Sequence, residues 1–200
     1  MKILIPFACP RCHTELQQTS PDELSCVRDG YRFACLDGIW RFLLPERAAY
    51  FEKFMQEYET IRKAEGRGSQ SSAYYQALPY QDLNGNMSAD WRIRAASFDL
   101  LLKKVIGPLE QPGRPLKLLD LGAGNGWLSN RLALRGHQVA AVDLMTNAFD
   151  GLACKDRYQN DFTALQAEFD CLPFPVLMGR HHWSGSGAGQ CAGSARAVLL

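Results

Sequence analysis

The chain has 200 residues, with 22 lysines and arginines against 21 aspartates and glutamates. This length fits one domain, or one domain with a small module attached. The balanced charge gives no strong field that would attract nucleic acid or an anionic membrane, so an RNA partner stays open but is not indicated. No apolar run reaches the ~18 residues that a membrane span needs.

The seven cysteines bear on the compartment. The apolar segment at the N-terminus is too short and too weakly charged for a secretory signal, and cysteines follow it at once. We therefore expect a cytoplasmic protein whose cysteines are free thiols or metal ligands.

Composition and periodicity divide the chain into four parts. They are a cysteine-containing β module (1–44), whose stretch 26–43 resembles a small zinc ribbon, a helical linker with the first helices of the next part (45–114), an α/β half-domain (115–174) and an irregular tail (175–200).

The N-terminal module carries a predicted metal site. Cys9 and Cys12 form a C-x-x-C knuckle, in which two thiolates on one tight turn bind the same zinc ion, and Cys26 supplies a third thiolate. The fourth ligand is open between Asp29, where a second knuckle would place it, and Cys35. A ribbon without metal is the remaining alternative. Zinc here would be structural, because no base stands beside an open coordination position.

The linker is predicted to be helical. Apolar residues recur at three- and four-residue spacings over residues 46–66, and a second helix fits residues 89–106 and ends at Gly107-Pro108. The α/β part is then predicted to form strand 117–121, helix 127–135, strand 138–143, helix 147–158 and strand 162–168.

A glycine loop follows the first of these strands. Gly122 allows an unrestricted φ as the chain leaves the strand, and Gly124 removes a Cβ where a ligand must approach the backbone. Gly126 stands where the next helix begins, so free amides and the helix dipole can meet a carboxylate. A dinucleotide fingerprint needs its third glycine one residue later, where Trp127 leaves little room for a pyrophosphate.

With Asp120 in front of it, this loop resembles the first motif of class I S-adenosylmethionine (SAM)-dependent methyltransferases. The resemblance implies that the loop backbone, including Ala123, holds the methionyl part of SAM. Asp143 matches the family's acid at the end of the second strand, which accepts hydrogen bonds from both ribose hydroxyls, and Leu144 follows it.

A third stretch, Ala167-Glu-Phe-Asp-Cys-Leu-Pro-Phe174, is similar to the acid-x-x-x-Leu-Pro-Phe sequence of type 11 methyltransferases. It implies that Glu168 binds the adenine amino group and that Phe169 offers its backbone amide to the ring. Asp170 is the alternative acid. The matches together cover residues 118–174.

The resemblance also implies what is missing. The fold class is α/β, with an incomplete Rossmann-like SAM-binding sheet of three strands preceded by the ribbon-like module and helices. After Pro175 a Gly/Ser/Ala-rich run replaces the fourth strand, which we interpret as a truncated or frame-shifted methyltransferase. The first strand would then be an exposed apolar edge. No catalytic residue is assigned, since the acceptor side normally lies on the later strands.

Three functions are therefore weighed. The first is a SAM-dependent methyltransferase of unknown acceptor, whose activity the missing strands put in question. The second is a non-enzymatic zinc-ribbon partner or regulatory module of a methyltransferase. The third, a nicotinamide oxidoreductase, is disfavoured by Trp127. The module also resembles the ribbon of ribosomal RNA guanine methyltransferases, but Gly30 stands where their fourth ligand is a histidine.

Overall fold

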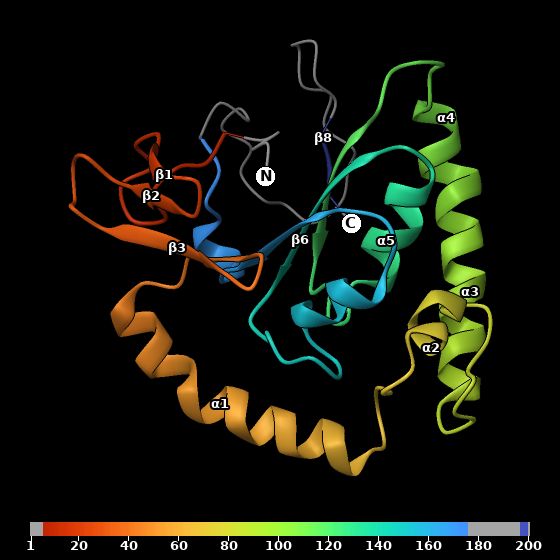
Figure 1. Ribbon diagram of the computed structural model, residues 1–200. Coiled ribbons are helices and arrows are strands. Elements are labelled where there is room, and N and C mark those ends of the chain that lie inside the picture. The colour runs from red at the N-terminus through yellow and green to blue at the C-terminus, as the bar shows by residue number, and fades with distance from the viewer. Residues whose placement is uncertain (1–5, 176–196, 200) are drawn as a thin grey trace.

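The structure is a computed structural model that describes residues 6–175 and 197–199. Within these residues the chain forms a mixed sheet of eight strands in the order β1-β2-β3-β4-β7-β6-β5-β8, with helices around it (Figure 1). The strands are β1 (Gln17–Ser20), β2 (Glu23–Ser25), β3 (Arg32–Leu36), β4 (Ile39–Arg41), β5 (Lys117–Leu121), β6 (Gln138–Asp143), β7 (Thr163–Gln166) and β8 (Ala197–Leu199).

The helical segments all lie between β4 and β8 along the chain. They are α1 (Pro45–Ala64), α2 (Ser72–Ala77), α3 (Ser88–Leu101), the π-helical turn η1 (Leu102–Ile106), α4 (Gly107–Leu109), α5 (Trp127–Leu134), and the 3₁₀ segments η2 (Leu152–Arg157) and η3 (Phe169–Cys171). No helix in the described ranges is both long enough and apolar enough to cross a bilayer.

The sheet has an antiparallel and a parallel part. Strands β1 to β4 pair antiparallel in sequence order. β4 then pairs in parallel with β7, where Ile39 lies opposite Ala164. β7, β6, β5 and β8 continue in parallel. Main-chain pairing therefore joins the N-terminal module to the α/β part without a break in the sheet.

The prediction of a three-strand sheet is wrong. β5, β6 and β7 are parallel neighbours as expected, but β4 extends the sheet beyond β7, and β8 pairs with β5 where Leu118 lies opposite Val198. β5 is therefore not an exposed edge, because both neighbours supply the main-chain partners that an apolar strand needs. β8 lies in the predicted irregular tail; residues 176–196 and 200 of that tail are outside the described residues.

Most element boundaries agree with the sequence prediction, and two do not. β5 and β6 have the expected bounds, while Gly107 and Pro108 begin α4 instead of ending a helix, because proline is tolerated in a first turn. The predicted helix 147–158 is a turn followed by η2. The Asn147 side chain accepts the amides of Phe149 and Asp150, at 3.2 and 2.9 Å, and so competes with helical hydrogen bonds.

Two apolar clusters cover the two faces of the sheet. Alternate residues of β6 point to opposite faces: Val139 and Ala141 pack with α2, α3 and α5, whereas Ala140 and Val142 pack with the ribbon-like module. α1 is different, because none of its residues is buried. It runs along one side of the molecule, from the end of the module to the region of α2 (Figure 1).

Candidate functional site

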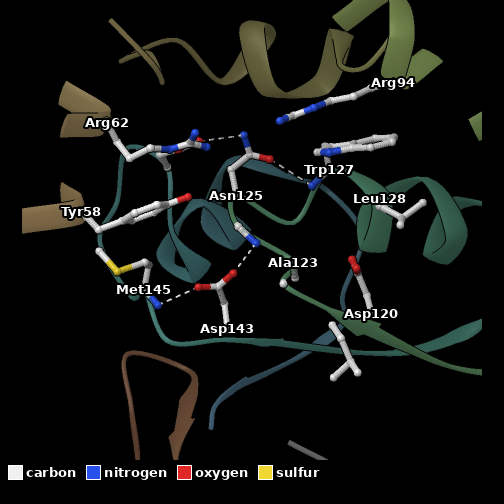
Figure 2. Close-up of a pocket in the computed structure, with 14 residues that line it drawn as sticks. Tyr58, Arg62, Arg94, Asp120, Ala123, Asn125, Trp127, Leu128, Asp143 and Met145 are labelled. Atoms are coloured by element: carbon white, nitrogen blue, oxygen red, sulfur yellow. Dashed lines mark hydrogen bonds and ion pairs between the residues drawn. The ribbon is translucent and has the colours of Figure 1, made fainter. Parts of the chain in front are cut away.

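A cavity of about 390 Å³ opens at the carboxyl ends of β5 and β6 (Figure 2). Its size is that of a small-molecule site, and this end of parallel strands is where α/β folds bind ligands. The strands and loops contribute Asp120, residues 121–125, Asp143, Met145 and Asp150 to its lining, and the helices contribute Tyr58, Arg62, Arg94, Trp127 and Leu128.

The glycine loop has the backbone that only glycine adopts readily. Gly122, Gly124 and Gly126 have φ angles of 75°, 53° and 78°. At Gly126 a Cβ would also stand 2.6 Å from the Phe162 ring, so a side chain is excluded by space as well. The amides of Gly122 and Ala123 both donate to the carbonyl oxygen at Val142, at 2.9 and 3.1 Å. These bonds fix the loop against the end of β6.

Asp143 is bound by the loop and by its own strand end. Its Oδ2 accepts the Gly124 amide and its Oδ1 accepts the Met145 amide, each at 2.8 Å. Burial raises the pKa of this carboxyl, and the backbone amides of Met145, Gly124 and Leu144 oppose that effect. Each carboxylate oxygen has a further lone pair. Asp143 lines the cavity, so both oxygens can accept hydroxyl groups of a ligand there.

Asp120 lies deeper. It is 4% exposed, and its Oδ2 accepts the Ser129 hydroxyl of α5 at 2.7 Å. Burial raises its pKa to about 6; the hydrogen bond from Ser129 opposes the rise, and the charge of Asp143 adds to it. Asp120 thus ties β5 to α5 while still lining the cavity.

A second acidic centre, Asp150, was not predicted from the sequence. Its Oδ2 accepts Arg62 Nε at 2.6 Å and its Oδ1 accepts the Asn125 amide nitrogen at 3.4 Å. The Oδ1 of Asn125 in turn accepts the amide of Trp127, the first residue of α5, at 3.2 Å. The Arg62–Asp150 pair therefore connects α1 to the glycine loop. The sequence could have indicated a polar contact to the loop at Asn125, because this residue stands between two of the loop glycines. It could not have indicated Arg62, because no pattern shows which face of α1 meets the sheet.

The predicted adenine-side residues lie beside the cavity and do not line it. Glu168 is bound by Arg47 of α1, with Nη2 to Oε2 at 2.6 Å and Nε to Oε1 at 3.0 Å. The Phe169 ring is exposed and passes close to Gly122, and Asp170 is exposed. The Leu144 carbonyl oxygen accepts the side-chain amide of Gln166 at 2.9 Å.

Trp127 occupies the first turn of α5, at the cavity wall. Its ring packs edge-on against Trp91 and Phe98 of α3, at centroid distances of 6.0 and 5.8 Å. The indole thus fills the place where a dinucleotide-binding helix would approach a pyrophosphate.

The N-terminal module brings its predicted ligands together. One donor atom each from Cys9, Cys12, Cys26 and Asp29 lies within 4.8 Å of the others, a set that could hold a metal ion. Cys12 Sγ and Cys26 Sγ are 3.5 Å apart, and Cys9 Sγ is 3.5 Å from Asp29 Oδ2. Between the two proposed fourth ligands, the fold places Asp29 in the cluster, while Cys35 lies on β3.

Two equivalent turns build this cluster. The amide of His13 bonds to the carbonyl oxygen of Cys9, and the amide of Gly30 bonds to that of Cys26, both at 2.9 Å. His13 and Gly30, which close the two turns, have left-handed backbone conformations with φ of 57° and 73°. Asp29 therefore holds in the second turn the place that Cys12 holds in the first. Burial raises the pKa of the Cys9 thiol to about 12, against the two turn amides that bond to its sulfur.

The comparisons with known proteins identify no family. A scan against protein-family models finds no match, and a search of curated proteins finds no similar sequence.

Proposed function

We propose that this chain binds S-adenosylmethionine in the cavity at the ends of β5 and β6 and acts in methyl transfer. The observation that carries the proposal is the position of Asp143. Its carboxylate ends β6, accepts the amide of Gly124, and keeps free lone pairs toward a cavity of about 390 Å³. A carboxylate beside a glycine loop suits a ribose, which offers two neighbouring hydroxyl donors.

Other residues, in the cavity wall and beside it, support a nucleoside whose other end carries an amino acid. The amides and small residues of the glycine loop allow close approach to the backbone. Asp120 offers a carboxylate to the ammonium group of an amino acid, while Glu168 and Phe169 remain the proposed partners of adenine. Glu168 can serve there only on the lone pairs that Arg47 leaves free.

The chain's contribution to methyl transfer would be positioning and exclusion of water. Bound SAM supplies an electrophilic methyl group, and holding it in line with an acceptor can lower the barrier by up to ~7–11 kcal/mol. α1 would cover the nucleoside, because Tyr58 and Arg62 already line the cavity. We assign no catalytic base; an acceptor that is unprotonated at working pH needs none.

We further propose that the cluster of Cys9, Cys12, Cys26 and Asp29 holds a structural zinc ion. A tetrahedral site with Zn–S bonds of about 2.3 Å separates its sulfur atoms by about 3.8 Å, close to the spacing in the cluster. The knuckle amides favour thiolates, as a zinc site requires. Co²⁺ is the probe: charge-transfer and d–d absorption of tetrahedral thiolate coordination should develop on titration and weaken in Cys12→Ser. Flat spectra would exclude the site.

The test of the nucleotide proposal is calorimetry on the full chain with a panel of ligands. SAM and its demethylated product S-adenosylhomocysteine should bind, and NADH should not. Binding of NADH in place of both would establish a nicotinamide site. If a folded chain binds none of them, the alternative of a non-enzymatic partner module is favoured, and co-purification with a methyltransferase subunit would identify it.

A further inference from the structure

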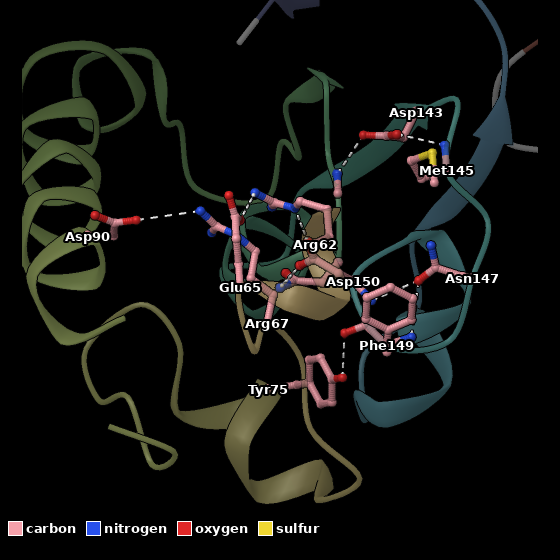
Figure 3. Close-up of polar contacts among 12 residues, drawn as sticks. Arg62, Glu65, Arg67, Tyr75, Asp90, Asp143, Met145, Asn147, Phe149 and Asp150 are labelled. Carbon is pink, nitrogen blue, oxygen red and sulfur yellow. Dashed lines mark hydrogen bonds and ion pairs between the residues drawn. The ribbon is translucent and has the colours of Figure 1, made fainter. Parts of the chain in front are cut away.

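Arg62 of α1 and Arg94 of α3 line the side of the cavity opposite β6, and the positive charge of Arg67, from the segment that follows α1, lies near them. The three arginines differ in whether they form ion pairs with acidic residues. Arg62 binds Asp150 at 2.6 Å, and Arg67 binds Glu65 at 2.5 Å and lies 3.6 Å from Asp90 (Figure 3).

Arg94 has no such partner. Among the described residues no carboxylate lies within salt-bridge distance of it, and its guanidinium donates no hydrogen bond. It stacks over the Trp91 ring, 4.6 Å from the centroid, and its tip extends over Trp127 toward the middle of the cavity (Figure 2). The guanidinium is thus held against an aromatic plane at the wall of the cavity.

The surroundings make this cation costly in the empty protein. Arg94 is half-buried, and its pKa is lowered by burial first and then by the positive charges of Arg67 and Arg62. Asp150 and Asp90 oppose these effects, but only from beyond salt-bridge distance. A guanidinium can hardly lose its proton, so a bound anion would compensate it further. The indole of Trp91 stacks against its face, and that of Trp127 stands beside it. A carboxylate is planar and matches the guanidinium with two parallel hydrogen bonds.

We propose that Arg94 is a carboxylate-binding residue that holds the amino-acid end of the bound nucleoside. The inference rests on the proposed SAM site and adds a contact at the end away from adenine. Arg94 lies over Trp127 at the start of α5, whereas Glu168 lies past the end of β7 and is bound by Arg47 of α1. The residue would therefore distinguish adenosyl amino acids from plain nucleosides of the same shape.

A ligand-truncation cycle tests this assignment. S-adenosylhomocysteine carries the carboxylate, and 5′-methylthioadenosine has the same thioether nucleoside without the amino-acid end. Both are titrated into the wild-type chain, Arg94→Met and Arg94→Lys. Arg92→Met, an exposed arginine of the same helix, is the matched control. We expect Arg94→Met to weaken S-adenosylhomocysteine by at least about tenfold, as loss of a charge-assisted hydrogen bond does, and to leave methylthioadenosine unchanged. Arg94→Lys should recover part of the loss.

Stability separates this role from a structural one. Arg94→Met should leave the thermal midpoint of the ligand-free chain unchanged or higher, because it removes a half-buried cation that makes no ion pair. Equal weakening of both ligands, or no weakening of either, would overturn the inference while leaving the SAM site standing. Failure of both ligands to bind the wild-type chain would overturn the site and the inference together.

Discussion

The amide of Gly124 donates a hydrogen bond of 2.8 Å to the carboxylate of Asp143. The bond connects the loop after β5 to the residue that ends β6, so the two strands present one continuous polar edge to the cavity. It also fixes the carboxylate before any ligand arrives, which reduces the entropy that binding must overcome. The same carboxylate has a structural and a proposed binding role, and its substitution can separate them.

Asp143→Ala should abolish detectable SAM binding, and Asp143→Asn should weaken it by at least about 100-fold, because two hydrogen bonds to a charged group are lost or reversed. In Asp143→Asn the amide nitrogen must face one of two backbone donors, so the loop also loses a bond. Calorimetry measures the affinity, and Asp161→Asn, an exposed aspartate near β7, is the control. Undiminished affinity in Asp143→Ala would remove Asp143 from the site.

The raised pKa of Asp120 predicts that the stability of the fold depends on pH. Its folded pKa of about 6 lies above the ~3.9 of an unfolded aspartate. The folded chain therefore binds this proton more tightly, and its stabilising effect, complete below about pH 4, is lost as pH rises through about 6. The free energy of unfolding that is lost over this pH range is about 3 kcal/mol.

Asp120→Asn removes this dependence. Its free energy of unfolding should exceed that of the wild-type chain at about pH 7.5, and the difference should shrink toward about pH 4. Urea titrations at several pH values measure it. SAM affinity should fall in the same variant if Asp120 meets the cofactor's ammonium group. A difference that stays constant with pH would show that Asp120 does not titrate in this range.

The sequence predicted the parts of this site that depend on local geometry. A glycine loop requires positive φ angles, and an alternating apolar run requires a strand, so β5, the loop and β6 were found with their residues. The ligand cluster with Asp29 followed from the repeat of a tight turn. Contacts between distant segments were not predictable: no local pattern pairs β4 with β7, or places Arg62 of α1 against Asp150. The helix predicted at 147–158 failed because Asn147 offered the backbone other partners.

Arg47 and Glu168 form a further pair between distant segments, and it bears on the proposed adenine contact. The Glu168 side chain is only 10% exposed, so losing its partner leaves a nearly buried carboxylate uncompensated. Arg47→Met should lower the thermal midpoint more than Arg32→Met, which breaks the exposed Arg32–Glu23 pair. If Glu168 also binds adenine, Glu168→Gln should weaken methylthioadenosine and S-adenosylhomocysteine by the same factor. A factor that differs between the two ligands would place Glu168 elsewhere.

Removal of the metal should affect residues 168–174, which include the proposed adenine contacts, as well as the ribbon-like module. The amide of Ala8, next to Cys9, donates to the carbonyl oxygen of Pro173 at 3.0 Å, and Phe7 packs against Phe174. Loosening the first knuckle therefore releases the segment that follows Glu168. We expect chelation of the zinc-loaded chain to lower the thermal midpoint and to speed hydrogen exchange at residues 168–174, with α3 as the unaffected reference. Faster exchange confined to the ribbon would show that the two parts are uncoupled.

Gly68 tests the packing of residues 66–69, the segment after α1 that carries Arg67, against the loop that carries Phe149 and Asp150. Its φ is +79°, and a Cβ there would collide with the backbone oxygen of Phe149, which also accepts the Tyr75 hydroxyl at 2.7 Å (Figure 3). Gly85 is the matched control, since its φ is +77° and a Cβ there would meet nothing within 4 Å. Gly85→Ala should cost only the left-handed strain of about 1–2 kcal/mol.

Gly68→Ala should cost at least about 1 kcal/mol more than Gly85→Ala in urea unfolding, because overpacking against backbone forces a shift. The shift would separate residues 66–69 from the loop that carries Asp150, so the variant should also bind SAM more weakly, whereas Gly85→Ala should bind it normally. Equal costs at the two glycines would mean that the segment moves aside freely. Arg62 would then depend on α1 alone for its position.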